Sequence, residues 1–280
     1  MPFTPTHVLA VLPIGLATRN LMPLSALAIG AMTPDATMFF PLLSPGYQEA
    51  HAAYGPILAC LPFGLMAFLL FQFVLKEPLI GLCPTAFRNR MAAISQPYVK
   101  PSVLFFLLVS VGIVTGAYTH LLWDSFTHRH RFGTELFPQL NQTYIIFGRT
   151  IPLFSILQHG SSVVGLPILF ISAMFWIQKQ PSVNDGLGEV FVATNSTRWL
   201  AVGFANLTVC QAFYEFGLDT WHTLEIRASQ TVTRSILVLT LAAVIYSVIL
   251  QFYCLREKRR DRIRRLRPGQ PTAPPRRRSE

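Results

Sequence analysis

Charged residues are scarce in this sequence of 280 residues. Only 13% are Asp, Glu, Lys or Arg, about half the share found in a typical soluble domain, whereas 51% are hydrophobic. A surface with so little charge is hard to keep in water, which excludes an ordinary soluble domain. The apolar residues also stand in long blocks, several of which reach the roughly 20 residues that a helix needs to cross a bilayer. The sequence therefore predicts an integral membrane protein.

Several motifs of other protein classes are also missing. The sequence has no glycine-rich phosphate loop and no Gly-x-Ser-x-Gly elbow, which argues against a serine hydrolase. Its four cysteines show no paired spacing and are interpreted as small hydrophobic residues. The N-terminus lacks the positively charged region of a secretory signal peptide, so we expect it to belong to the mature protein.

The net charge of +10 is concentrated at one end of the chain. Residues 255–280 hold 11 Lys/Arg and 3 acids, a net charge of +8, whereas the first 254 residues hold 12 Lys/Arg and 10 acids, a net charge of +2. Such a tail next to a membrane helix is attracted by anionic lipid and fixes orientation. Membrane lipid, including anionic lipid at the tail, is therefore the predicted partner, and no nucleic acid is expected.

The hydrophobic pattern predicts an all-α polytopic membrane helix bundle with about five full spans and a short N-terminal helical hairpin. The hairpin covers two apolar runs, 8–18 and 21–32, each too short to span alone, so it either crosses or re-enters the membrane. Residues 33–52 are interpreted as a loop because they contain three prolines and a glycine. The five spans are predicted at 53–75, 102–123, 151–177, 199–218 and 232–254, the third with Ser161 or Ser162 as an alternative start.

Three regions follow from this pattern: a membrane region at 1–178 with the candidate site, a pair of membrane helices at 179–254, and a disordered basic tail at 255–280. The positive-inside rule places the tail in the cytoplasm and the loop 76–100, which is also basic, on the same side. We therefore expect a multi-pass protein of the cell inner (cytoplasmic) membrane with a cytoplasmic C-terminus. All seven histidines then fall on or toward the outer face.

The strongest chemical pattern lies at the end of the second predicted span. If this segment is helical, His120, Asp124 and His128 are four residues apart and project from one face. An imidazole and a carboxylate at this spacing can bind one metal ion, as in helical zinc sites. Ionisable residues at a membrane helix end are costly against lipid, so they are expected to face the bundle interior. The alternative is a polar helix end that only marks the water boundary.

Other candidate ligands are predicted at helix ends on the same side. Each is weak alone, since an Asp after a Pro is normally a turn or cap residue, but together they supply five or six N and O ligands. That number is enough for one or two divalent ions, with zinc expected. His130, between two arginines, is interpreted as part of a solvated loop. The predicted ligands are His7, Asp35, His51, His120, Asp124 and His159.

A family resemblance rests on four stretches, MPFTPTH (1–7), GAMTPDATMFF (30–40), THLLWDSFTH (119–128) and LQHGSSVVG (157–165). They resemble a family of bacterial membrane proteins of unknown function, which in turn is similar to the inner-membrane metal-dependent hydrolases. The resemblance implies that the six residues above are metal ligands. Those hydrolases often have His-Arg and His-Ser pairs in the middle of the site, where this sequence has Glu49-Ala-His51-Ala.

The leading hypothesis for function is a membrane-bound, metal-dependent hydrolase that acts on a phosphoester or lipid-linked substrate at the outer face. An anionic headgroup is expected to bind Arg129, Arg131 or Arg149, unless these are solvated. The alternative is a non-enzymatic polytopic membrane protein, for transport, assembly or scaffolding, with a structural metal site or none. The span centres carry almost no charge and no repeat is visible, which disfavours a transporter.

Overall fold

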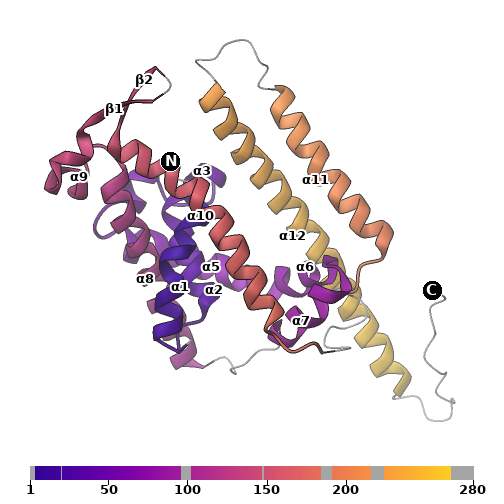
Figure 1. Ribbon diagram of the computed structural model, residues 1–280. Helices are drawn as coiled ribbons and strands as arrows, with labels where there is room; N and C mark the ends of the chain where they lie inside the picture. Colours follow the sequence, from indigo (N-terminus) through magenta and orange to yellow (C-terminus); the bar gives the residue numbers. More distant parts are fainter. Residues whose placement is uncertain are drawn as a thin grey trace.

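The computed structural model shows an all-α membrane helix bundle with one two-stranded hairpin (Figure 1). It describes residues 4–19, 21–95, 102–146, 148–183, 191–215 and 224–265. Four helices among these residues are long and apolar enough to cross a membrane, and they cover Pro56–Leu82, Val103–Thr127, Leu153–Gln178 and Thr231–Arg260. The chain is therefore a multi-pass membrane protein.

The N-terminal hairpin consists of two short helices, α1 (Val8–Ala17) and α2 (Leu24–Met32), as the short apolar runs predict. A 3-10 turn, η1 (Thr4–His7), precedes α1. Helix α2 packs on α8 (Val103–Thr127) with the backbones in contact: a Cβ on Gly30 would lie 2.1 Å from the Ile113 carbonyl oxygen, and one on Gly116 would lie 2.2 Å from that of Leu27. Small residues permit this close approach between membrane helices.

The proline-containing stretch that follows the hairpin is more ordered than the loop expected there. It forms the 3-10 turn η2 (Thr33–Asp35) and two one-turn helices, α3 (Ala36–Phe39) and α4 (Tyr47–Ala50). The prolines do not oppose these turns, because Pro34 occupies an early position of η2, where its missing N–H has no helical partner to lose. Short helices pair backbone groups that an irregular loop would leave without partners.

The first span continues well past the predicted residue 75. It contains two π-helical turns, η3 (Pro56–Cys60) and η4 (Phe71–Leu75), on either side of α5 (Leu61–Leu70), and it ends with α6 (Lys76–Leu82). The segment expected as a basic loop also holds α7 (Thr85–Ser95). The side chain of Arg90 donates to the carbonyl oxygens of Gln178 and Gln180, which attaches α7 to the end of α10 (Leu153–Gln178).

Helix α8 continues through Asp124 to Thr127, so the polar end predicted on one helical face is indeed helical. After it come α9 (Phe132–Leu136), the 3-10 turn η5 (Pro138–Asn141) and an antiparallel hairpin of β1 (Thr143–Ile146) and β2 (Arg149–Pro152). Thr143 pairs with Pro152 and Ile146 with Arg149. Helix α10 begins directly after β2 at Leu153, ahead of the alternative starts at Ser161 and Ser162.

The C-terminal pair contains α11 (Asn195–Glu215) and α12 (Leu224–Arg265). The fourth predicted span, 199–218, overlaps α11, but the described part of α11 does not meet the criteria of length and hydropathy for a span. The described residues therefore hold four such helices where five were expected. Polar residues such as Asn206 and Thr208, which bond to carbonyl groups one turn back, lower its hydropathy. His222 and most of the basic tail lie outside the described residues.

The two ends of the bundle differ in chemistry. The N-terminal turn, α9 and the β-hairpin lie together at one end, whereas α6, α7 and the C-terminal end of α12 lie at the other (Figure 1). The second end carries the basic residues of these helices, among them Lys76, Arg88, Arg90 and Arg256. The histidines of the predicted site lie at the first end, so the fold separates the predicted site from the basic segments.

Candidate metal site

Five of the six predicted ligands converge at one end of the bundle. His7 comes from η1, Asp35 from η2, His51 from the residue that follows α4, and His120 and Asp124 from the last two turns of α8. All five side chains are buried, with no more than 7% of any residue exposed. Ligand atoms of Asp35, His51, His120 and Asp124 lie within 4.8 Å of one another. Segments far apart in the sequence therefore build one His/Asp cluster.

The two central histidines present the same ring nitrogen to the cluster. Nδ1 of His120 lies 2.8 Å from the carbonyl oxygen of Ala31, and Nδ1 of His51 lies 2.9 Å from that of Tyr47. Because a carbonyl accepts only from N–H, the proton of each neutral ring is on Nδ1 and the lone pair of Nε2 points into the cluster. A backbone carbonyl commonly orients a metal-binding histidine in this way.

Carboxylate oxygens of Asp35 and Asp124 face these lone pairs at distances of 3.3 to 3.8 Å. Nε2 of His120 lies 3.3 Å from Oδ2 of Asp124 and 3.7 Å from Oδ1 of Asp35. Nε2 of His51 lies 3.7 Å from Oδ2 of Asp124 and 3.8 Å from Oδ1 of Asp35. The other oxygen of Asp35 accepts a hydrogen bond of 2.8 Å from the Thr4 hydroxyl. That hydroxyl fixes which oxygen of Asp35 faces the histidines.

This spacing fits a divalent metal ion. Ligand atoms 2.0–2.2 Å from a tetrahedral zinc stand about 3.3–3.6 Å apart, close to the distances between these nitrogen and oxygen atoms. Oδ1 of Asp35 and Nε2 of His51 and His120 are buried and have no hydrogen-bond partner among the described residues. Leaving such atoms unpaired is costly, and a shared cation would satisfy all three. The donor set of two imidazoles and two carboxylates suits zinc and other divalent ions.

His7 lies at the edge of this set. Its ring stacks on that of His120 with centroids 3.8 Å apart, and its Nε2 lies 3.6 Å from Oδ1 of Asp124, the oxygen that does not face His51. Burial, followed by the neighbouring His120, lowers the pKa of His7 to about 3. The ring is therefore neutral at neutral pH and has a nitrogen lone pair available beside Asp124.

Comparison with known protein families assigns nearly all of the chain to a single family. The model of the family described as Domain of unknown function (DUF4184) matches residues 1–251. The chain is a DUF4184 protein. No curated protein and no solved structure matches it. The match covers all four stretches of the resemblance and agrees with a family of unknown function, while the similarity to metal-dependent hydrolases stays a prediction.

The sixth predicted ligand of this DUF4184 protein is placed elsewhere. His159 is exposed on α10, whereas its neighbour Gln158 is buried and points toward the cluster end of α8. The amide nitrogen of Gln158 lies 2.9 Å from Nε2 of His128, and Nδ1 of His128 lies 3.2 Å from the carbonyl oxygen of Asp124. Gln158 thereby orients His128 beside Asp124, a role that the sequence did not reveal.

His128 has left the α8 helix and borders the DUF4184 site. Its backbone is extended, with φ −130° and ψ 144°, so it does not continue the four-residue spacing of His120 and Asp124. Its Nδ1 lies 3.6 Å from Oδ1 of Asp124. Burial is the main cause that lowers the pKa of His128. Both ring nitrogens have hydrogen-bonding neighbours, unlike those of His7.

Tyr47 is another site residue that sequence reasoning missed. It is half-buried in α4, and its ring lies against that of His51 with centroids 4.0 Å apart. Burial raises the pKa of the Tyr47 phenol, the negative charges of Asp124 and Asp35 add to this effect, and Arg131 opposes it through its charge and a hydrogen bond. A signal existed in the sequence, since Tyr47 precedes His51 by one helical turn.

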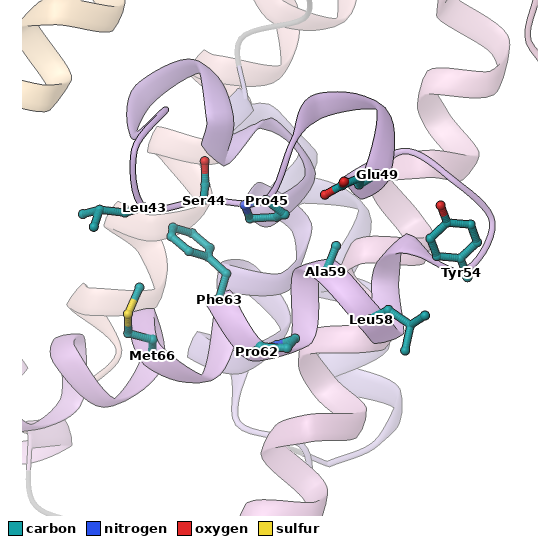
Figure 2. Close-up of a pocket in the computed structure, with 10 residues that line it drawn as sticks. All are labelled: Leu43, Ser44, Pro45, Glu49, Tyr54, Leu58, Ala59, Pro62, Phe63 and Met66. Carbon is teal, nitrogen blue, oxygen red and sulfur yellow. The ribbon is translucent and has the colours of Figure 1, made fainter.

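An apolar groove of about 590 Å³ is lined in part by Glu49 of α4 (Figure 2). One wall comes from residues 43–54 and the other from the first turns of the Pro56–Leu82 span. Glu49 and Tyr54 lie at one end of the groove, and Leu43 and Met66 lie at the other (Figure 2). The full lining is Leu43, Ser44, Pro45, Glu49, Tyr54, Leu58, Ala59, Pro62, Phe63 and Met66.

Proposed function

We propose that this DUF4184 protein is a membrane-bound, metal-dependent hydrolase that acts on a phosphoester or lipid-linked substrate at the outer face of the membrane. The observation that supports it most is the set of buried, unpaired nitrogen and oxygen atoms that converge from four segments. A purely structural core has little use for two carboxylates and three histidines, because ionisable groups are costly to bury in a membrane protein. Such groups mark functional sites by default.

The roles of the side chains follow from their contacts. His51, His120, Asp35 and Asp124 would hold the ion, with one or two zinc ions as the expected occupants. A bound divalent ion supplies a water of pKa near 7 and polarises the scissile group. Thr4 and the carbonyl groups of Ala31 and Tyr47 keep their ligands in place. His7 and His128, beside the second oxygen of Asp124, are positioned to accept or hold a proton.

The apolar groove supports a lipid-linked substrate. Its helical wall belongs to a membrane span, and Leu58 and Met66 on this wall are 69% and 50% exposed, so the groove faces lipid rather than water. The groove and the cluster are adjacent in the sequence: Glu49 lines the groove, and His51, two residues later, belongs to the cluster. An acyl chain in the groove would bring its headgroup to the same end of the bundle.

The placement at the outer face rests on charge. The basic segments lie at the end of the bundle opposite the cluster, and basic loops of membrane proteins remain in the cytoplasm. The C-terminus would then be cytoplasmic, in the inner membrane. The second candidate is a non-enzymatic membrane protein with a structural metal site. The closed set of four buried donors favours it, because structural zinc sites have four protein ligands and catalytic ones keep a position open.

Metal content tests the proposal. The chain is purified in detergent without chelator, and metals per chain are measured by mass spectrometry for the parent, Asp124→Ala and His159→Ala. We expect one or two zinc or other divalent ions in the parent, near-complete loss in Asp124→Ala, and no change in His159→Ala, whose side chain is exposed outside the cluster. A parent without metal, even after reconstitution with each candidate ion, would contradict the proposal.

Hydrolysis distinguishes the two candidate functions. The metal-loaded parent is incubated with phosphoesters and with phospholipid vesicles, and product is measured against Asp124→Ala at equal protein. Turnover that is lost with Asp124→Ala supports the hydrolase. Metal whose removal by a chelator unfolds the chain, without turnover on any of these substrates, supports the structural site.

A further inference from the structure

The Asp124 carboxylate also faces two histidines outside the four-donor set, which consists of Asp35, His51, His120 and Asp124. Nε2 of His7 and Nδ1 of His128 each lie 3.6 Å from Oδ1 of Asp124. Oδ2 of the same carboxylate instead faces Nε2 of His51 at 3.7 Å and Nε2 of His120 at 3.3 Å. Asp124 therefore stands between two pairs of imidazoles, with one oxygen directed at each pair.

One ion in the four-donor set would leave polar atoms on the other side of Asp124 without partners. Both ring nitrogens of His7 and Oδ1 of Asp124 are buried and have no hydrogen-bond partner among the described residues. Only 1% of the His7 side chain is exposed, so bulk water does not reach it. Unpaired buried nitrogen and oxygen atoms are costly. A second cation between them would satisfy both side chains.

The spacing around Oδ1 of Asp124 is that of metal ligands. Atoms joined by an N–H···O hydrogen bond stand about 2.7–3.2 Å apart, so at 3.6 Å neither His7 nor His128 shares a proton with Oδ1 in a good hydrogen bond. Ligand atoms of a tetrahedral zinc ion stand about 3.3–3.6 Å apart. Both distances therefore fit an ion better than a proton.

Gln158 can select the nitrogen of His128 that binds metal. Its amide nitrogen lies 2.9 Å from Nε2 of His128, while Nδ1 lies 3.2 Å from the carbonyl oxygen of Asp124 and 3.2 Å from the Thr127 hydroxyl. An amide carries both a donor and an acceptor, so a half-turn of the Gln158 side chain lets its oxygen accept from Nε2–H. The lone pair of His128 is then on Nδ1, toward Oδ1 of Asp124. Such an acceptor commonly fixes the tautomer of a metal-binding histidine.

This second group of donors is more open than the four-donor set. The His128 side chain is 19% exposed, whereas those of His51 and His120 are 2% and 0% exposed. His7, His128 and Asp124 supply three donors, and a tetrahedral ion with three protein ligands keeps one position for water or substrate. The four-donor set keeps no such position. The second group therefore has the open coordination that a hydrolytic site needs.

We propose that Asp124 bridges two divalent ions: Oδ2 binds the ion of the four-donor set, and Oδ1 binds a second ion together with His7 and His128. The inference deepens the proposed function and rests on it, because the two ions share a ligand. The lone pairs of His7 and His128 that can hold a proton beside a single ion would bind the second ion instead. Imidazole and carboxylate donors suit zinc, and an ion with an open position supplies the metal-bound water.

Zinc stoichiometry tests the second ion. The full-length chain in detergent is saturated with zinc, freed of excess by gel filtration and analysed by mass spectrometry for the parent, His7→Ala, His128→Ala and the control His130→Asn. We expect two zinc ions per chain in the parent and one in His7→Ala and in His128→Ala. His130 is exposed and has a φ of 56°, a backbone conformation in which asparagine is also common, so His130→Asn should keep both ions.

The outcomes separate this inference from the proposed function. A parent that holds no more than one zinc ion overturns the second ion and leaves the four-donor site standing. Two ions in His7→Ala or in His128→Ala also overturn it, because that histidine is then not a ligand. Loss of both ions from a folded His7→Ala chain would place His7 in the first site and would contradict the division into two groups. A parent without zinc overturns both the inference and the proposed function.

Substitutions of Gln158 test the second ion without removal of a ligand, and they decide the matter if a histidine variant does not elute as a folded species. Gln158→Glu can still accept from Nε2–H of His128 and should keep or tighten the second zinc ion. Gln158→Leu cannot, and should weaken that ion about 10- to 100-fold with the first unchanged. Competition with a metal-binding dye measures both affinities. Equal affinities in the parent and both variants would overturn the role of His128.

Discussion

The helix pair α2 and α8 and the C-terminal pair α11 and α12 differ in how much of their surface is buried and in which polar residues they bury. A third of the most apolar part of α8 is buried, against 11% of that of α12. Helix α8 buries His120 and Asp124, whereas the buried polar residues described in α12 are the small hydroxyl residues Thr231, Ser235 and Ser247. Large apolar residues of α11, such as Trp199 and Leu200, are 74% exposed.

This difference shows that buried ionisable side chains in a membrane protein need closely packed helices to orient them. The Nδ1 hydrogen bond from His120 to Ala31 exists because α2 and α8 approach closely through their glycines. The C-terminal pair holds no buried carboxylate among its described side chains and mostly presents apolar surface suited to lipid. Close packing is therefore concentrated in the region that orients polar groups.

The largest effect is expected when a methyl group is added to a glycine between α2 and α8. Gly116→Ala in α8 would place a Cβ 2.2 Å from the Leu27 carbonyl oxygen, so α2 and α8 must move apart. Such overpacking costs about 1–3 kcal/mol or more. We expect a melting temperature lower by several degrees and a loss of bound metal, measured by thermal unfolding in detergent and by metal analysis.

The matched control is Gly203→Ala in α11. A Cβ there meets no atom within 4 Å among the described residues, and alanine stabilises a helix relative to glycine by about 1 kcal/mol. Its melting temperature should be equal to or slightly above that of the parent, with unchanged metal. If both substitutions have the same effect, the two regions do not differ in packing as described.

A smaller effect is expected from the hydroxyl that orients Asp35. Thr4→Val removes the 2.8 Å hydrogen bond to Asp35 and keeps the shape of the side chain. Loss of such a supporting contact typically weakens metal binding about 10- to 100-fold. Competition with a metal-binding dye measures the affinity. Thr208→Val in α11, whose hydroxyl donates to its own helix, is the control and should leave metal affinity unaltered.

The sequence predicted the fold class and much of the site for identifiable reasons. His120 and Asp124 are one turn apart on a long apolar helix, so their shared face could be derived from spacing alone. His159 could not be placed in this way. It neighbours Gln158, and only one of two adjacent residues on a helix can face the interior, so packing of α10 decides between them.

Other features depended on contacts between distant segments. The tautomer of His120 is set by the carbonyl group of Ala31, which lies 89 positions earlier in the chain. Three prolines made 33–52 look like a loop, although prolines fit the first positions of short helices. Four helices met the criteria for a span where five were expected, because polar residues such as Asn206 and Thr208 lower the hydropathy of the described part of α11.

The smallest effect on the site is expected from removal of the tail. Deleting residues 261–280 takes away seven Lys/Arg, and we propose that these residues attract anionic lipid. Native mass spectrometry should show fewer bound anionic lipids per chain, while metal content stays at the parental value. Loss of metal in this variant would show that the tail affects the His/Asp cluster and would contradict the independence of the two regions.

The length of α12 has a consequence of its own. Its 42 residues rise about 63 Å at 1.5 Å per residue, roughly twice the thickness of a bilayer core. Tilt cannot absorb such an excess, so the helix must project from the membrane as a stiff rod. The basic residues between Arg256 and Arg260 are then held at the fixed spacing of a helix, so a partner would bind charges in defined positions.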